Sequence, residues 1–149
     1  MKSPFAKFLL GFAVFSLLVV YNYNKARVAL KDTRQSQLSI DVLAPQTAKQ
    51  GQTVPFSWQI TAPADFQTTD TTIFYSAVST PSAVTKSDSP QALGYQFSLS
   101  DYRSGNFNLP HTFKANIVFP KPGVYFLRAY SFVRNNHLWT EEKQIVITP

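Results

Sequence analysis

Alternation of apolar and polar side chains, repeated in short stretches after residue 37, is the feature that most limits what this chain can fold into. The stretch TVPFSWQIT, residues 53–61, has Val, Phe, Trp and Ile at every second position, with polar residues or proline between them. Successive side chains of a β-strand point to opposite faces, so this period of two predicts a strand with one buried face. LSIDV, residues 38–42, predicts a second strand of the same kind.

Further stretches complete a set of about seven short strands. They are TTIFYSAV (71–78), YQFSL (95–99), TFKANIVF (112–119), GVYFLRAYSFV (123–133) and QIVIT (144–148). Turn residues separate them at AKQG, PKPG and RNNH, because glycine adopts positive φ and proline fixes φ near −65°. This pattern predicts an all-β fold, a two-sheet antiparallel β-sandwich. Pro55 predicts either an edge strand or a position whose N–H would point away from its neighbour.

Two of these stretches carry a resemblance to a known fold. GQTVPFSW, which leads into the second strand, and PGVYFLRAY, which forms the penultimate one, resemble immunoglobulin-like and fibronectin-type-III-like sandwiches. The resemblance covers residues 37–149 and implies architecture only, because such domains serve many unrelated roles. It implies that Gly123 and Tyr125 form the turn and the tyrosine of a tyrosine corner. Leu127 stands where antibody-type domains carry a cysteine, so the disulfide of that branch is absent.

An uncharged apolar run, FLLGFAVFSLLVVY at residues 8–21, precedes these strands. As a helix it reaches about 21 Å, against roughly 30 Å of hydrocarbon in a bilayer. Residues 5–23 lengthen it if Lys7 extends to the headgroups and Tyr21 and Tyr23 lie at the interface. We therefore expect an N-terminal hydrophobic helix that attaches the chain to the membrane through residues 5–23 as an uncleaved signal anchor.

Two other interpretations of the apolar run stay open. Lys2 and Lys7 also suit the basic region of a cleaved secretory signal, although no pair of small residues follows the run as a cleavage site requires. A buried soluble helix is the third, and it is disfavoured because the run is apolar on every side. We expect residues 1–36 to form the anchor helix and a basic stem, and residues 37–149 to form the Ig-like domain. The whole layout is similar to single-pass surface proteins of prokaryotes, which implies no activity.

The net charge of +6 is concentrated in the stem. Residues 1–34 hold six basic residues and one acidic residue, and the rest of the chain holds eight and seven, which leaves +1. The body therefore lacks the basic surface that a phosphate backbone requires, and we expect no nucleic-acid binding. More basic residues follow the apolar run than precede it, which favours a cytoplasmic body. The low charge and the many Ser, Thr, Asn, Gln and Pro residues are typical of exported domains, and we expect the body outside the cell membrane.

Catalytic and metal-binding patterns are missing from the sequence. His111 and His137 lie far apart with no cysteine in the chain, whereas a zinc or copper site needs three or four converging ligands. We expect two loop histidines, no metal and no cofactor. Glu141 and Glu142 are adjacent on a predicted strand and would point to opposite faces, so we expect them to be solvated. No Gly-rich phosphate loop or G-x-S-x-G stretch is present, and we expect a protein without catalytic residues.

A possible binding surface comes from the strand at residues 123–133. If Tyr125, Leu127, Ala129 and Val133 face the core, a cation and three rings share the opposite face: Phe126, Arg128, Tyr130 and Phe132. Left exposed, this aromatic stripe would suit another surface protein or a glycan. The alternative is that the connection at residues 79–111 folds over the stripe and leaves Arg128 at its rim, since large exposed apolar patches are rare in monomers.

The sequence as a whole favours a non-enzymatic, membrane-anchored, extracytoplasmic Ig-like domain that binds a protein or a polymer. A pilin-like filament subunit is a second hypothesis, because pilins also join an apolar helix to a β-domain. Gly11 lacks the preceding basic residue of such proteins, and Ser16 stands where bacterial type IV pilins carry glutamate. A carbohydrate-binding accessory module is a third hypothesis, and it depends on exposure of the aromatic stripe.

Overall fold

The computed structural model describes residues 16–30, 37–80 and 83–149, and the chain divides into two compact units at Gln37 and Leu38. The predicted boundary differs from this division by one residue. In the first unit, residues 16–30 are helical. No helix within the described ranges has both the length and the apolar character needed to cross a bilayer. The part of the predicted anchor before residue 16 lies outside the described residues.

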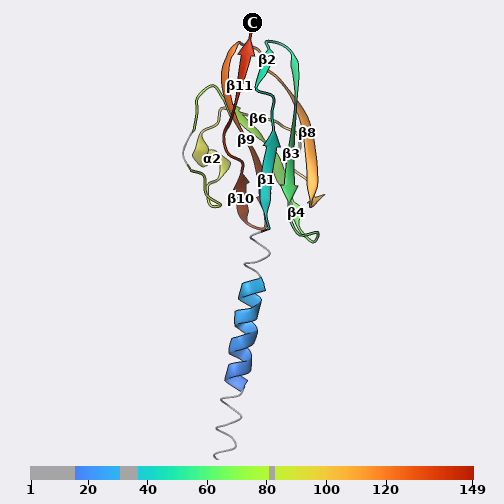
Figure 1. Cartoon of the computed structure of the whole chain (residues 1–149), viewed down its shortest axis with the longest axis vertical. Helices are drawn as coiled ribbons and strands as arrows, with labels where there is room; N and C mark the ends of the chain where they lie inside the picture. Colours follow the sequence, from blue (N-terminus) through green and yellow to red (C-terminus); the bar gives the residue numbers. More distant parts are fainter. Residues whose placement is uncertain (1–15, 31–36, 81–82) are drawn as a thin grey trace, which may run out of the picture. The chain divides into compact units, whose positions relative to one another are not determined.

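The second unit consists of two β-sheets that pack face to face (Figure 1). The first sheet has the order β1 (Ser39–Leu43), β3 (Thr53–Thr61), β8 (His111–Val118). The second has the order β2 (Thr47–Lys49), β11 (Lys143–Thr148), β9 (Gly123–Val133), β5 (Asp70–Ser76), β6 (Phe97–Ser98), with β10 (Asn136–Trp139) also paired to β9. A separate ladder joins β4 (Gln67–Thr68) to β7 (Phe107–Asn108), and the short helix α2 spans Pro90–Leu93.

The start of the body switches between the two sheets. The strand β1 pairs antiparallel with β3 in the first sheet, and β2 pairs parallel with β11 in the second. The two strands are separated by only three residues, of which Pro45 cannot donate to a ladder. All other strand pairs in the two sheets are antiparallel, and this arrangement gives the all-β, Ig-like sandwich that the strand pattern predicts. The strands predicted at residues 53–61 and 123–133 are confirmed with the same bounds.

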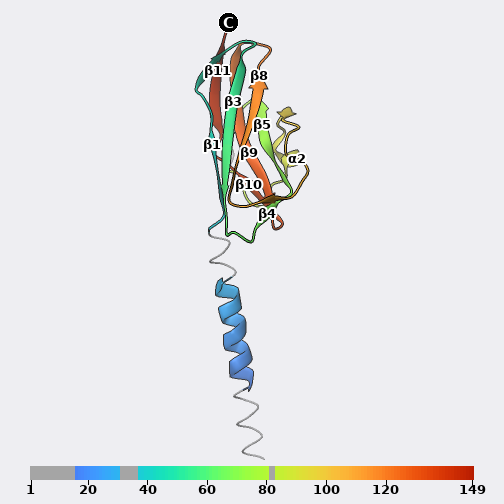
Figure 2. The same cartoon turned by 90° about the vertical axis from the view of Figure 1, so that its right-hand side faces the viewer.

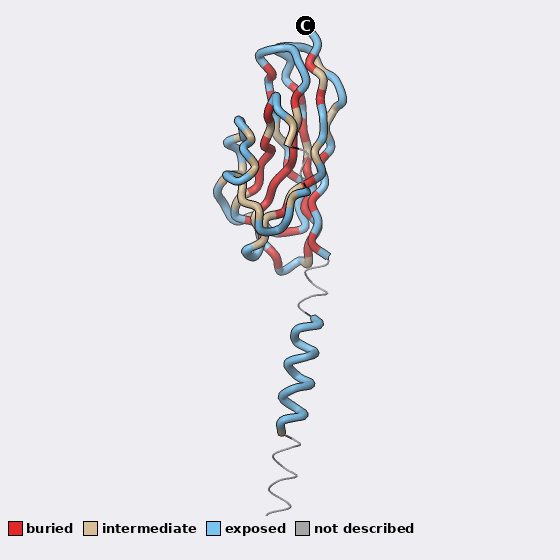
Figure 3. Tube along the Cα trace, turned by 90° about the vertical axis from the view of Figure 1, so that its left-hand side faces the viewer, coloured by how far each residue is buried: buried red, intermediate tan, exposed pale blue. Residues whose placement is uncertain are grey.

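The core lies between the sheets, and among the described residues its first member is Leu38 (Figure 3). Trp58 on β3 is its largest fully buried side chain and stacks on Phe113 of β8, with ring centroids 5.5 Å apart. Trp58 Nε1 donates to Thr71 Oγ1 at 2.8 Å, and Thr71 Oγ1 donates to the Tyr130 carbonyl at 2.6 Å. The first bond links the two sheets through buried polar atoms, and the second joins neighbouring strands of the second sheet.

The tyrosine corner is confirmed. Tyr125 Oη donates to the carbonyl of Lys121 at 3.2 Å, across the turn before β9. Gly123 within that turn has a φ of 143°, which side chains rarely tolerate.

The presence of Pro55 in a central strand has a local explanation. The strand β3 is central in its sheet, so the prediction of an edge strand is wrong for the strand as a whole. The ladder between β1 and β3 ends at the pair Leu43–Ser57, however, because β1 then leaves for the other sheet. Pro55 lies beyond that end and therefore needs no N–H on the β1 side.

Candidate functional site

The four residues of the predicted aromatic stripe lie on the outer face of the second sheet. The alternate residues of the same strand belong to the core cluster, as the parity of the strand predicts: Tyr125, Leu127, Ala129 and Val133. Neighbouring strands place Phe74 beside Arg128 and Trp139 beside Tyr130 on that outer face.

The middle of this stripe is buried. Arg128 is 4% exposed and Tyr130 is 2% exposed, whereas Phe126 and Phe132 are half-buried. The helix α2, in the segment between β5 and β6, lies outside this sheet (Figure 2). Arg128 and Tyr130 are therefore covered, as the alternative interpretation of the stripe predicts. The expectation that Arg128 lies at the rim of the covered surface is wrong. A binding role for Phe126, Arg128, Tyr130 and Phe132 stays a prediction.

The Arg128 guanidinium joins three segments of the chain. Its Nε donates to Tyr95 Oη at 3.1 Å, and its Nη1 donates to the Thr140 carbonyl at 2.8 Å. Its Nη2 donates to the Thr80 carbonyl at 3.1 Å. A buried guanidinium is stable only with partners of this kind. Arg128 thus attaches the covering connection to β9 and to the residues between β10 and β11.

Glu142 completes this network from the other side. Its carboxylate accepts hydrogen bonds from Ser79 Oγ at 2.5 Å, the Thr80 N–H at 2.9 Å and Tyr95 Oη at 2.8 Å. Burial raises the pKa of Glu142, but these bonds and the charge of Arg128 outweigh burial and hold the pKa below its ordinary value. Burial first, and then the bond to Glu142, raises the pKa of Tyr95 far above its ordinary value.

The expectation for Glu142 is therefore wrong. It lies between β10 and β11 rather than on a strand, and it is half-buried rather than solvated. The sequence held one signal for this role, since a cation among aromatic residues needs a nearby carboxylate when it is buried. Spacing alone could not choose among the acidic residues of the body.

Aromatic rings fill the space around the network. Tyr130 contacts Phe74 and Trp139, with ring centroids 5.7 Å and 4.6 Å apart, and Trp139 stacks on Tyr95 at 6.5 Å. Trp139 Nε1 donates to the carbonyl of Asp88 at 2.9 Å, which brings a second part of the connection onto the sheet. Burial raises the pKa of Tyr130 to about 12. These rings form a small apolar layer outside the main core.

Both histidines lie on strands rather than in loops. His137 on β10 shares a 2.8 Å hydrogen bond between its Nδ1 and Tyr130 Oη, and His111 is the first residue of β8. Among residues 16–30, 37–80 and 83–149, no three His, Asp or Glu side chains gather closely enough to hold a metal ion.

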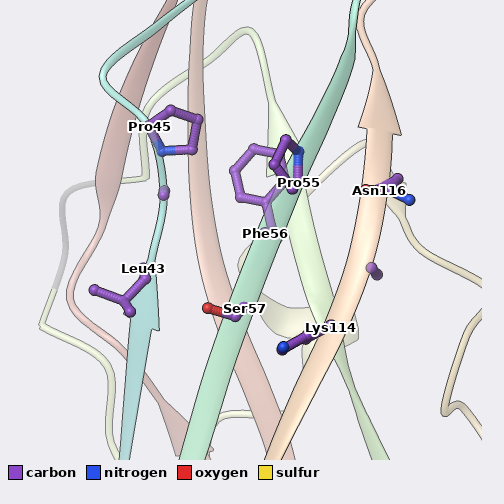
Figure 4. Close-up of a pocket in the computed structure, with 9 residues that line it drawn as sticks. Leu43, Pro45, Pro55, Phe56, Ser57, Lys114 and Asn116 are labelled. Atoms are coloured by element: carbon purple, nitrogen blue, oxygen red, sulfur yellow. The ribbon is translucent and has the colours of Figure 1, made fainter.

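A groove of about 600 Å³ crosses the outer face of the first sheet (Figure 4). Its floor is formed by Pro55 and Ser57 on the central strand, and Leu43 and Lys114 lie on either side. The groove exists because β1 leaves the sheet after Leu43 and because the side chains at 55 and 57 are small. The alternation of β3 predicts only that one face is buried and does not reveal the groove, since the chain leaves the sheet after β1 because of Pro45 and the pairing of β2 with β11.

No protein-family description and no curated protein sequence matches this chain. Among solved structures, it is similar to the PKD domain of an M14-like peptidase from a Thermoplasmatales archaeon, with 15% identity, a TM-score of 0.48, and 74% of this chain and 94% of that domain covered. It is similar to a CARDB domain from Pyrococcus furiosus with 6% identity, a TM-score of 0.43, and coverage of 75% and 94%.

A superoxide reductase from Ignicoccus hospitalis is also similar, with 13% identity, a TM-score of 0.45, and coverage of 78% of this chain and 85% of that one. Likenesses at this level of identity and TM-score carry no conclusion about activity or partner.

Proposed function

We propose that this chain is a non-enzymatic, membrane-anchored module whose Ig-like body lies outside the cell and binds another surface protein or a polymer. The anchor is the N-terminal segment at residues 5–23, and the recognition surface is the groove over β3. The exposed apolar side chains of the helix are the observation that carries the proposal.

Four consecutive apolar residues of the helix are exposed. Leu17 is 70% exposed, and Leu18, Val19 and Val20 are each more than half exposed. Consecutive residues point to all sides of a helix, so no single packing partner could cover them. In water each such side chain costs about 1.5 to 3 kcal/mol relative to burial, and a lipid environment removes that cost. Lys25 and Arg27 follow on the same helix and suit a headgroup region.

Fractionation of intact cells tests the anchor. We expect the chain to stay with the membrane after an alkaline wash, and we expect Val14→Lys to release it, because a charge at the centre of the apolar run at residues 8–21 is costly in lipid. Val28→Lys is the matched control, since Val28 lies among polar and basic residues beyond the run, and it should stay bound. Release of the unchanged chain by the alkaline wash would contradict the anchor.

Protease digestion of intact cells tests the side of the membrane. A body outside the cell is degraded without permeabilisation, whereas protection until the membrane is opened would place it in the cytoplasm.

The groove supports the binding part of the proposal. It offers apolar contact from Leu43, which is 76% exposed, beside the hydroxyl of Ser57 and the ammonium of Lys114. An extended peptide or polymer chain could lie along β3 in it.

A pull-down tests the groove: the body is labelled with a fluorophore and pelleted with cell-envelope polymer from the same cells. Ser57→Trp fills the groove and should prevent the body from binding to the polymer. Gln59→Trp on the same face but outside the groove should leave binding intact. Equal retention by both variants would remove the groove from the proposal.

A further inference from the structure

The outer edge of β8 is the longest strand edge of the body with no neighbouring strand. Within the described residues, β8 ends the order β1-β3-β8 and pairs only with β3. The edge strands of the second sheet are much shorter, since β2 spans Thr47–Lys49 and β6 spans Phe97–Ser98. An unpaired strand edge presents backbone N–H and C=O groups that can pair with another strand.

Pro55 determines which backbone groups of β8 point outward. In an antiparallel ladder, hydrogen-bonded pairs alternate with pairs that exchange no bond. Pro55 has no N–H and pairs with Asn116, so Asn116 belongs to a pair that exchanges no bond with β3. Its N–H and C=O therefore point away from β3, and by alternation so do those of Thr112, Lys114 and Val118. Independently, the Lys114 carbonyl accepts a hydrogen bond from Tyr102 Oη at 3.1 Å.

We propose that this edge pairs antiparallel with β8 of a second copy of the chain, in the register centred on Ala115. Pro110 and Pro120 bound the edge at equal distances from Ala115. Neither proline can donate to a ladder. Only the register centred on Ala115 pairs every outward residue between the two prolines with a residue that can both donate and accept a hydrogen bond.

This register is also self-complementary in its side chains. On the outer face it places Lys114 opposite Asn116 of the second copy, and Thr112 opposite Val118. On the inner face it places Phe113 opposite Ile117, both buried in the single body, so apolar residues meet apolar residues. The neighbouring register centred on Lys114 would set two lysines opposite each other, which is unfavourable. Lys114 therefore selects the register.

Tyr102 leaves room for the second strand. Its ring packs on Trp58 and Phe113, whose side chains face the interior, with centroids 5.8 Å and 5.1 Å away. Its hydroxyl thus reaches the Lys114 carbonyl from the interior side. A carbonyl oxygen has two lone pairs, so it can accept a second bond in the plane of the sheet.

Engineered cysteines test the register cleanly, because the chain has no cysteine of its own. With the full chain in detergent micelles under mild oxidation, a mixture of Lys114→Cys and Asn116→Cys should form a mixed dimer about tenfold faster than Gln59→Cys forms its homodimer. Gln59 is exposed on the same face but on the central strand, so it reports collision within a micelle. A mixed dimer that forms no faster than this control would overturn the proposal.

Substitutions at Asn116 test the association itself by sedimentation. Asn116→Glu places a carboxylate opposite each Lys114 and should tighten the dimer about fivefold, whereas Asn116→Lys should weaken it about fivefold. Asn116→Pro removes an outward N–H without touching the bonds to β3, so it should keep the folded body and abolish the dimer. Equal sedimentation of the Glu and Lys variants at matched concentrations would also overturn the proposal.

Discussion

The outer faces of the two sheets follow the same alternation in sequence but end in different environments. On the first sheet, Gln59 and Lys114 are exposed to solvent. On the second, Arg128 and Tyr130 are buried beneath the connection between β5 and β8. Alternation determines which side chains share a face, and the length and composition of the connections determine whether that face is covered. The covered face is stabilised by one polar network, and the bare face has none.

The largest expected difference comes from removing the rings of the covered face. The triple variant Phe126→Ala, Tyr130→Ala and Phe132→Ala should lower the free energy of unfolding by about 5 kcal/mol or more, since a buried ring replaced by Ala costs about 3 to 5 kcal/mol. This loss is comparable to the whole stability of a small domain. Circular dichroism of residues 38–149 should report an unfolded or barely folded body.

The matched triple variant on the bare face, Ser57→Ala, Gln59→Ala and Lys114→Ala, should stay folded with a change of about 1 kcal/mol or less. Two triple variants of equal stability would break the comparison between the faces.

Arg128→Ala should lower the free energy of unfolding by about 3 kcal/mol. It leaves the carbonyls of Thr80 and Thr140 without their donor and removes the cation beside Glu142. Urea unfolding measures the effect. Lys114→Ala on the bare face is the control, and it should change stability by less than about 0.5 kcal/mol.

Removal of a single hydroxyl should distinguish the two faces on a smaller scale. Tyr95→Phe breaks the link between Arg128 and Glu142 and should cost about 1.5 kcal/mol. Tyr102→Phe loses only its bond to the Lys114 carbonyl at the sheet edge, so we expect about 0.5 kcal/mol. A larger loss for Tyr102→Phe in thermal unfolding would reverse the ranking.

The last comparison is between two pH values for one variant. The pKa of Glu142 is lower in the folded body than its ordinary value, so its contribution to stability is present above the unfolded pKa of about 4.3 and is lost as the pH falls through the folded pKa. Glu142→Gln should therefore cost about 1 kcal/mol at pH 7 and less at pH 3. If urea unfolding gives the same loss of stability at both pH values, the charge of Glu142 does not stabilise the folded body.

Strands with clean alternation were predictable, because their pattern follows directly from burial of one face. β3 and β9 keep their predicted bounds, whereas YQFSL contributes only Phe97–Ser98 to a strand. The short strands β2, β4, β7 and β10 were not predicted, since two to four residues carry no usable period.

The candidate site was predictable only as a set of residues on one face. Parity correctly grouped Arg128 with Tyr130, and the rarity of large exposed apolar patches pointed to the connection as a cover. The partners of Arg128 could not be found in the same way. Tyr95, Thr80 and Glu142 meet it through the path of a long connection, and that path depends on tertiary contacts rather than on any local pattern.

The exchange of the Arg128 side-chain Nε–H with water tests most directly whether the second face is covered. In the NMR spectrum of residues 38–149 at neutral pH, this proton should persist as a sharp signal and show contacts to the ring of Tyr95, because the bond to Tyr95 Oη shields it. The Nε–H of the exposed Arg134 should exchange too fast to be seen. An Arg128 signal that exchanges as fast as that of Arg134 would contradict the covered face and return the aromatic stripe to the surface.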